Sequence, residues 1–145
     1  MDMETLRGLV DPELYEWLDN ILEMCNAPYA VGNGIELIRA EKEYVSMRKT
    51  VSPGDLNSNG VVHGAASYGL IDHVFAVICN MDVRTVGLSC NIIYHRPCFG
   101  SVMEAEAKVI NRSKSLMTVE VTLRSEGKLI ATATCIGFVS RRPER

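Results

Sequence analysis

The chain has 145 residues, the length of one domain at roughly 150 residues per domain. Its 15 Lys and Arg against 18 Asp and Glu give a net charge of −3, which argues against a general nucleic-acid binder. A hydrophobic content of 47% excludes a disordered chain, and no apolar run approaches the roughly 20 residues that span a bilayer. We therefore expect one domain over residues 1–145, with no nucleic-acid or membrane partner.

An amphipathic helix is expected near the N-terminus, over about residues 11–25. Asp11 is a favourable helix N-cap, and Pro12 suits the first helical position. Apolar residues then recur with the spacing of one helix face (Leu14, Trp17, Leu18, Ile21 and Leu22). Residues 26–34 contain a proline and two glycines and are expected to form a loop.

A strand and a long helix are expected next. Residues 35–51 have a strand-like pattern, which ends at the turn-forming residues 52–55. Residues 63–80 are nearly all small or apolar and too long for one strand, so they predict a helix buried on most sides. Gly60 and Gly64 stand at its beginning, where a tight turn into a helix would need glycine.

The second half of the chain predicts four strands, because apolar and polar residues alternate in segments 86–94, 103–109, 117–123 and 129–139. Residues 125–128 indicate a hairpin turn, and short turns between successive strands predict an antiparallel meander. The sheet must bury one face against the long helix. The sequence therefore predicts an α+β protein of the hotdog architecture, an antiparallel sheet wrapped around a central helix, with a core over about residues 35–140 and an extra N-terminal helix.

The most informative motif is Asn57-x-x-Gly60-x-x-His63-Gly64, followed by Asp72 nine residues after the histidine. It resembles the motif of the hotdog-fold acyl-CoA thioesterases of the phenylacetate-degradation and 4-hydroxybenzoyl-CoA thioesterase type, N-x-x-G-x-x-H-G-G and then an Asp or Glu at the same distance. The resemblance covers roughly residues 45–139 and continues in three further segments (Tyr94-x-Arg96-Pro97, 109–112 and 127–131).

Two positions depart from the family pattern. Ala65 replaces the usual second glycine of the motif. The Ser or Thr that some relatives use on the following strand has no clear counterpart, and Thr85 and Ser89 are the candidates.

The candidate catalytic groups are Gly64 and Asp72. Amide groups in the first turn of a helix have no intrahelical acceptor, so the N–H of Gly64 can polarise a thioester carbonyl. Asp72 lies in an apolar helix, where an ionised carboxylate must be paired, hydrated or functional. Eight residues of helix separate the two by about 12 Å, so one carbonyl can reach both only if they belong to two chains.

Further residues of the motif are candidates with less defined roles. The resemblance implies that Asn57 contacts the substrate or the attacking water, although an Asx-turn role is equally open. His63, beside the glycine, is a candidate base but more typically holds the loop by a hydrogen bond. Gly60 and Ser89 are candidate substrate contacts. Arg96, Arg112 and Lys114 are candidates for binding the phosphates of coenzyme A.

The expected function is hydrolysis of an acyl-CoA thioester, with Asp72 as nucleophile or as general base. The alternatives are a non-catalytic acyl-CoA-binding module and a hotdog dehydratase acting on hydroxyacyl thioesters. The resemblance implies a homodimer with one continuous sheet, and we expect dimers to assemble into a homotetramer.

Neither a metal nor an organic cofactor is expected, since three scattered histidines (His63, His73 and His95) lack metal-ligand spacing. An odd number of cysteines without C-x-x-C spacing indicates buried thiols rather than disulfides (Cys25, Cys79, Cys90, Cys98 and Cys135). Together with an acidic N-terminus that shows no export signal, they predict a cytoplasmic protein.

Overall fold

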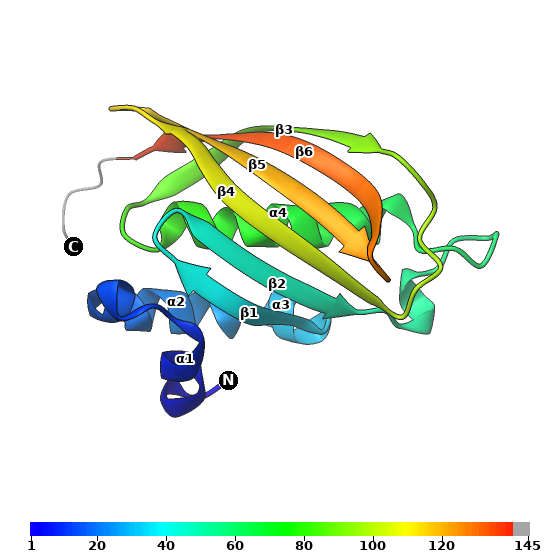
Figure 1. The fold of residues 1–145 in the computed structure, drawn as a ribbon, viewed down its shortest axis with the longest axis horizontal. Coiled ribbons are helices and arrows are strands. Elements are labelled where there is room, and N and C mark those ends of the chain that lie inside the picture. The colour runs from blue at the N-terminus through cyan, green and yellow to red at the C-terminus, as the bar shows by residue number, and fades with distance from the viewer. Residues whose placement is uncertain (141–145) are drawn as a thin grey trace.

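The sheet wraps around one long helix, α4 (Gly64–Asn80), in the computed structural model, which describes residues 1–140 (Figure 1). All neighbouring strands are antiparallel, in the order β1-β2-β4-β5-β6-β3. The strands are β1 (Ile35–Glu41), β2 (Tyr44–Thr50), β3 (Thr85–Tyr94), β4 (Val102–Arg112), β5 (Leu116–Ser125) and β6 (Lys128–Val139). This arrangement is the predicted hotdog architecture.

The core lies between the concave face of the sheet and α4. The alternation read from the sequence is confirmed, because the alternate apolar residues at 103–107 of β4 and 117–123 of β5 are buried while the charged residues between them are exposed. The residues of the helix that are fully buried against this face are Leu70, Ile71, Val74, Val77 and Ile78. Packing of this apolar face, rather than helix propensity, holds α4 in place.

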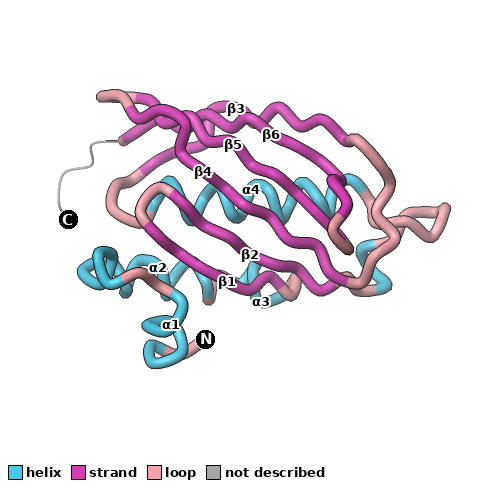
Figure 2. Tube along the Cα trace, in the orientation of Figure 1, coloured by secondary structure: helices cyan, strands magenta, loops and turns pink. Residues whose placement is uncertain are grey.

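The N-terminal segment contains more helix than the sequence predicts (Figure 2). Asp11 accepts a hydrogen bond from the Glu13 amide, as expected of a helix start, but the first turns form a 3₁₀ helix, η1 (Pro12–Trp17), before α2 (Leu18–Cys25). Helix α1 (Met3–Leu9) was not expected, and part of the predicted loop 26–34 forms the short helix α3 (Pro28–Gly32). These helices pack along β1 and the flank of α4.

The sheet differs from the prediction in two places. Residues 35–51 form a hairpin of β1 and β2 rather than one strand, with Glu43 in the left-handed region at the turn (φ 61°). Neither turn residue is glycine, proline or asparagine, so the sequence gives no turn signal there. Only β4, β5 and β6 form the expected meander, because β3 pairs with β6 at the sheet edge. Alternation specifies which side chains share a face, but it does not specify neighbouring strands.

Strand β3 leaves an apolar edge uncovered on the single chain. Its exposed side chains include Leu88, Ile93 and Tyr94, which are between half and two-thirds accessible. The helix is buried on most sides, as predicted, but next to this edge it presents Tyr68 and Asp72 to solvent. A long apolar sheet edge is a ready surface for pairing with a second strand.

Candidate active site

A buried ion pair fixes the loop that leads into α4. The Lys49 Nζ atom, on β2, lies 3.0 Å from an Asp55 carboxylate oxygen, and both side chains are at most one-tenth exposed. The same carboxylate accepts a hydrogen bond from the Ser52 amide, and the Asp55 backbone carbonyl accepts one from the His63 amide. Burial opposes ionisation of Asp55, but its hydrogen bonds with Ser52 and Lys49 hold its pKa below the ordinary value.

Helix α4 begins where the sequence predicts, with His63 as its N-cap. The imidazole Nδ1 atom of His63 accepts a hydrogen bond from the Ala65 amide at 2.9 Å, which agrees with a loop-holding role. Within residues 1–140, the amide of Gly64 has no hydrogen-bond acceptor. This free donor at the positive end of a helix can bind a partly negative oxygen.

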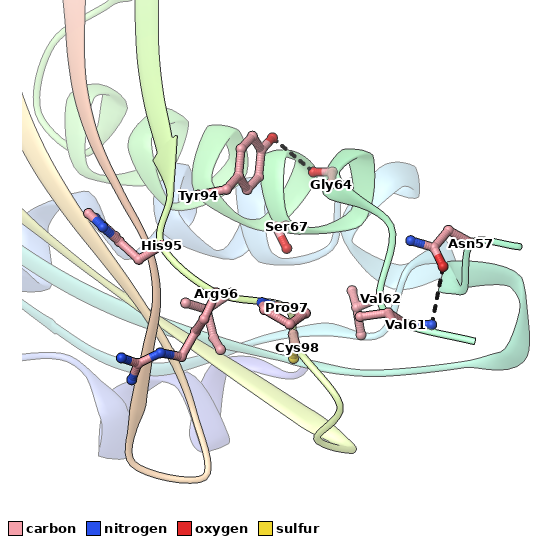
Figure 3. Close-up of a pocket in the computed structure, with 11 residues that line it drawn as sticks. Asn57, Val61, Val62, Gly64, Ser67, Tyr94, His95, Arg96, Pro97 and Cys98 are labelled. Carbon is pink, nitrogen blue, oxygen red and sulfur yellow. Dashed lines mark hydrogen bonds between the residues drawn. The ribbon is translucent and has the colours of Figure 1, made fainter. Parts of the chain in front are cut away.

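Gly64 lines a cavity of about 390 Å³ between the loop before α4, the first turns of the helix and the end of β3 (Figure 3). The lining residues are Asn57, Val61, Val62, Gly64, Ser67, Tyr94, His95, Arg96, Pro97, Cys98 and Ile130. The cavity thus brings together three of the predicted residues, Asn57, Gly64 and Arg96.

The two glycines of the motif have different physical roles. Gly60 has a φ of +71°, a conformation that side chains disfavour, so the loop itself requires glycine there. Gly64 has no such conformation, and a Cβ atom placed on it would meet the Tyr94 ring at an ordinary contact of 3.4 Å. Backbone geometry therefore does not require glycine at position 64, and the lack of a side chain leaves the amide open to the cavity.

Asn57 has the Asx-turn role that the sequence left open, and it also lines the cavity. Its side-chain oxygen accepts hydrogen bonds from the amides of Asn59 (2.9 Å) and Val61 (3.2 Å), which is an Asx-turn arrangement. Its side-chain nitrogen points into the cavity (Figure 3). The loop bonds therefore orient the amide group so that its N–H donors face the cavity.

Two polar residues of the cavity, Tyr94 and Ser67, were not among the predicted site residues. The Tyr94 hydroxyl donates a hydrogen bond to the Gly64 carbonyl at 3.2 Å. Ser67 is 3% exposed, and its hydroxyl lies 3.6 Å from the Met103 sulfur, a weak acceptor. The sequence could have indicated Ser67 as a cavity residue, because it follows Gly64 by three positions and so lies on the same side of the helix.

Asp72 lies outside this cavity and is exposed on the single chain. On the single chain the carboxylate is therefore hydrated, one of the possibilities that the sequence left open. Asp72 belongs to the uncovered stripe of α4, and about 12 Å of helix separates it from Gly64. A carbonyl at the Gly64 amide cannot contact Asp72 of the same chain.

A cysteine of β3 lies near Asp72. A bulge in β3 lies between Gly87 and Ser89, and it leaves Ser89 exposed and Cys90 on the concave side, opposite the buried Cys135. Burial raises the pKa of Cys90, and the nearby Asp72 carboxylate contributes to this increase. The hydroxyl of Thr85, the other candidate, is occupied by a hydrogen bond to the Cys79 carbonyl.

The other predicted cationic residues lie at the opposite end of α4. Arg112 forms an ion pair with Asp82 at 3.0 Å, just after the C-terminus of the helix, and Lys114 is exposed in the adjoining turn. Along a helix of 17 residues, this end lies about 25 Å from Gly64. A single chain therefore does not bring Arg112 and Lys114 to the cavity.

The remaining histidines take separate positions. His95 forms a 2.8 Å hydrogen bond with Thr132, and burial lowers the pKa of the half-buried His73. Over the part of the chain that the structure describes, no three metal-ligating side chains cluster in a way that could hold an ion. No helix in that part is long and apolar enough to cross a membrane.

Comparison with known proteins gives consistent matches. The sequence profile of the thioesterase superfamily matches residues 59–131, just over half of the 145 residues. The acyl-coenzyme A thioesterase PaaI of Escherichia coli is 28% identical over 92 residues, which are 62% of this chain and 66% of that protein.

Solved structures agree with this match. A variant of the phenylacetic acid degradation protein PaaI from Thermus thermophilus is 31% identical, with a TM-score of 0.75 over 78% of this chain and 99% of that one. The E. coli PaaI structure is 23% identical and shares the fold, with a TM-score of 0.81 over 89% and 94% of the two chains.

Proposed function

Because the chain belongs to the thioesterase superfamily, we propose that it hydrolyses acyl-CoA thioesters at a site shared between two copies. The observation that carries this proposal is the free amide of Gly64 at the wall of a cavity, with no side chain to block it. A thioester oxygen bound there gains negative charge during attack on its carbon, and a preorganised N–H stabilises that charge.

Asp72 of a second chain supplies the other half of the chemistry. It either attacks the carbonyl carbon or removes a proton from the water that does so. Collapse of the tetrahedral intermediate breaks the carbon–sulfur bond, and coenzyme A leaves as a thiolate that takes up a proton. When water attacks, the acyl group is released directly as the carboxylic acid. When Asp72 attacks, the acyl group forms a mixed anhydride with Asp72, which a water molecule then hydrolyses to the acid. The side-chain amide of Asn57 is placed to orient the substrate or the water. This mechanism needs neither a metal nor an organic cofactor.

The apolar edge of β3 supports the dimer. Antiparallel pairing of two β3 strands would cover Leu88 and Ile93 and continue the sheet from one chain to the other. It would also place the Thr85 end of one strand beside the Tyr94 end of the other. The exposed stripe of α4 that holds Asp72 would then face the second chain.

The same pairing explains how distant cations can serve the cavity. Arg112 and Lys114 lie at the side of the domain where β3 begins. In the antiparallel dimer, these residues of the second chain would lie near the cavity at the end of β3 in the first chain. Their phosphate-binding role is therefore proposed for the dimer, and a homotetramer of two such dimers is the proposed assembly. All five cysteines are free thiols, which supports a reducing, cytoplasmic location.

The decisive experiment measures thiol release from short-chain, long-chain and aryl acyl-CoA substrates. Hydrolysis of at least one of them is expected from the wild-type protein. Binding of acyl-CoA without thiol release would instead support a non-catalytic module, and hydration of enoyl-CoA would support a dehydratase. Either result would overturn the proposal.

A further inference from the structure

One aromatic ring stands uncovered in the middle of α4. Of the residues of this helix, all of which the structure describes, three are exposed (Ala65, Tyr68 and Asp72), and the others are buried or half-buried. Tyr68 is 42% exposed and is the only large hydrophobic side chain of α4 in this state. It belongs to the stripe of the helix that faces the second chain in the proposed dimer.

Tyr68 lies midway between the two proposed catalytic groups of its own chain. It follows Gly64 by four residues and precedes Asp72 by four, so the three residues share one line along the helix. Each step of four residues covers about 6 Å. Partial burial raises the pKa of Tyr68, and the nearby Cys90 thiol and Asp72 carboxylate add to this increase, so the ring lies close to both groups.

The proposed shared site determines where the symmetry axis of the dimer passes α4. Gly64 of one chain and Asp72 of the other act on one thioester, and the second site holds the same pair with the chains exchanged. In an isologous dimer, a twofold axis relates two such contacts. The axis therefore passes the helix at the midpoint between residues 64 and 72, which is residue 68. The Tyr68 rings of the two chains consequently meet between the two sites.

A thioester bound at Gly64 has its two halves on opposite sides of the reacting carbon. Coenzyme A carries phosphates, which are costly to remove from water, so the sulfur side leads out through the open cavity. The acyl group then extends the other way, along α4 into the space between the chains. The first large side chain that it meets on this stripe is Tyr68, about 6 Å along the helix from Gly64.

We propose that the Tyr68 rings of both chains form the shared end wall of the two acyl pockets and limit the length of the acyl group. The inference deepens the proposed function and rests on it and on its shared site. A wall at this distance favours short acyl groups over long ones, because a longer chain would have to displace a ring in a packed interface. Tyr68 is therefore a determinant of specificity rather than a catalytic residue.

The first test compares acyl-CoA substrates that differ only in the length of a saturated acyl chain. Tyr68→Ala should raise the ratio of kcat/KM for long chains to that for short chains by about 10-fold or more, the range for contacts in an apolar pocket. Tyr68→Phe keeps the ring and should keep the wild-type ratio, which separates the size of the side chain from its hydroxyl group. An unchanged ratio in Tyr68→Ala would overturn the proposal.

The matched control for this test is another exposed tyrosine. Tyr15→Ala removes a side chain of η1 that is 39% exposed and lies outside the stripe of α4. It should leave the ratio at the wild-type value. A shift in Tyr15→Ala as large as the shift in Tyr68→Ala would show that loss of any surface tyrosine changes the ratio, and would refute the specific role of Tyr68.

Cross-linking tests the position of Tyr68 without any turnover. A short bifunctional maleimide should join two Tyr68→Cys chains, because their thiols would lie together at the twofold axis. Asp72→Cys is the control, since its two thiols would be eight residues apart, or about 12 Å along the helices. The wild-type protein, which has five free cysteines, gives the background. Denaturing electrophoresis measures the joined dimer, and a Tyr68→Cys yield no higher than that of Asp72→Cys would refute the wall.

The two tests separate failure of this inference from failure of the proposed function. Wild-type hydrolysis of acyl-CoA together with an unchanged chain-length ratio in Tyr68→Ala would refute the Tyr68 wall alone. Cross-linking at residue 68 without hydrolysis of any acyl-CoA would contradict the proposed function, and the acyl pocket with it, while sustaining the arrangement of the two helices.

Discussion

The hydroxyl of Tyr94, the last residue of β3, donates a hydrogen bond to the carbonyl of Gly64, the first residue of α4. The bond joins the end of the edge strand to the start of the central helix. The tyrosine ring also lies next to the space where a side chain on Gly64 would extend. The Gly64 amide is thus fixed from two sides, by this bond and by the loop anchored on Asp55.

Substitution of Gly64 should block the oxyanion donor. In Gly64→Val, the methyl groups would displace the Tyr94 ring and obstruct a carbonyl oxygen, whereas the single Cβ of Gly64→Ala meets the ring at 3.4 Å. We expect turnover to fall by about 10²–10³-fold in the valine variant and much less in the alanine variant. Steady-state thiol release measures the effect, with thermal melts as the control for folding. Full activity in a valine variant that melts like the wild type would place the carbonyl elsewhere.

Asp72→Asn should abolish most of the activity while leaving the fold intact, because the side chain is exposed and nearly isosteric. Loss of a general base lowers turnover by at least about 10²-fold. Thiol release from the purified variant is the measurement. Asp19→Asn, which removes an exposed carboxylate of α2, is the matched control and should retain wild-type turnover. An Asp72→Asn protein with near-wild-type turnover would falsify the catalytic assignment.

The shared site predicts complementation between two inactive variants. Asn57→Asp keeps the side-chain oxygen that holds the loop and replaces the amide nitrogen that faces the cavity. Mixed dimers of Asn57→Asp and Asp72→Asn chains contain one intact site, so activity should rise toward a quarter of the wild-type value. Mass spectrometry confirms subunit exchange. The two-chain site is excluded if exchange is complete and no activity returns.

A charge on the apolar edge of β3 should separate the chains and inactivate the protein. Leu88 is 60% exposed, and Leu88→Lys places a charge where the second strand would pair. Light scattering should show a monomer, and thiol release should be lost with the dimer. Ile110→Lys, at a residue of β4 that is 56% exposed and away from this edge, should remain dimeric and active. A fully active Leu88→Lys monomer would contradict the shared site.

Asp55 should make the stability of the protein dependent on pH in the acid range. Its pKa lies below the ordinary value of 3.8 in the folded state, so its ionised form stabilises the fold. This contribution is fully present above the ordinary pKa and is lost as the pH falls through the folded value. Urea unfolding measured from about pH 2.5 to about pH 7 spans this transition. The free energy of unfolding of Asp55→Asn should fall less on acidification than that of the wild type. Parallel curves for the two proteins would count against the ion pair with Lys49.

The local features of the site were accessible from the sequence because they depend on neighbours along the chain. The start of α4 at Gly64, the N-cap at His63 and the turn at Gly60 follow from residue types within a few positions of one another. The alternation in β4, β5 and β6 likewise identified their buried faces. Such patterns encode local conformation and the side of an element that avoids water.

Only the tertiary structure decided how those elements meet. It placed β3 at the sheet edge beside β6, left Asp72 on an uncovered stripe, and turned Cys90 rather than Ser89 toward the helix through a bulge. It also formed a hairpin at Glu43 without a turn signal and brought Asn57, Gly64 and Arg96 to the wall of one cavity. Strand neighbours, register shifts and the exposure of one helix face depend on contacts between residues far apart in the chain, because packing energy is shared by the whole sheet and helix rather than by any local segment.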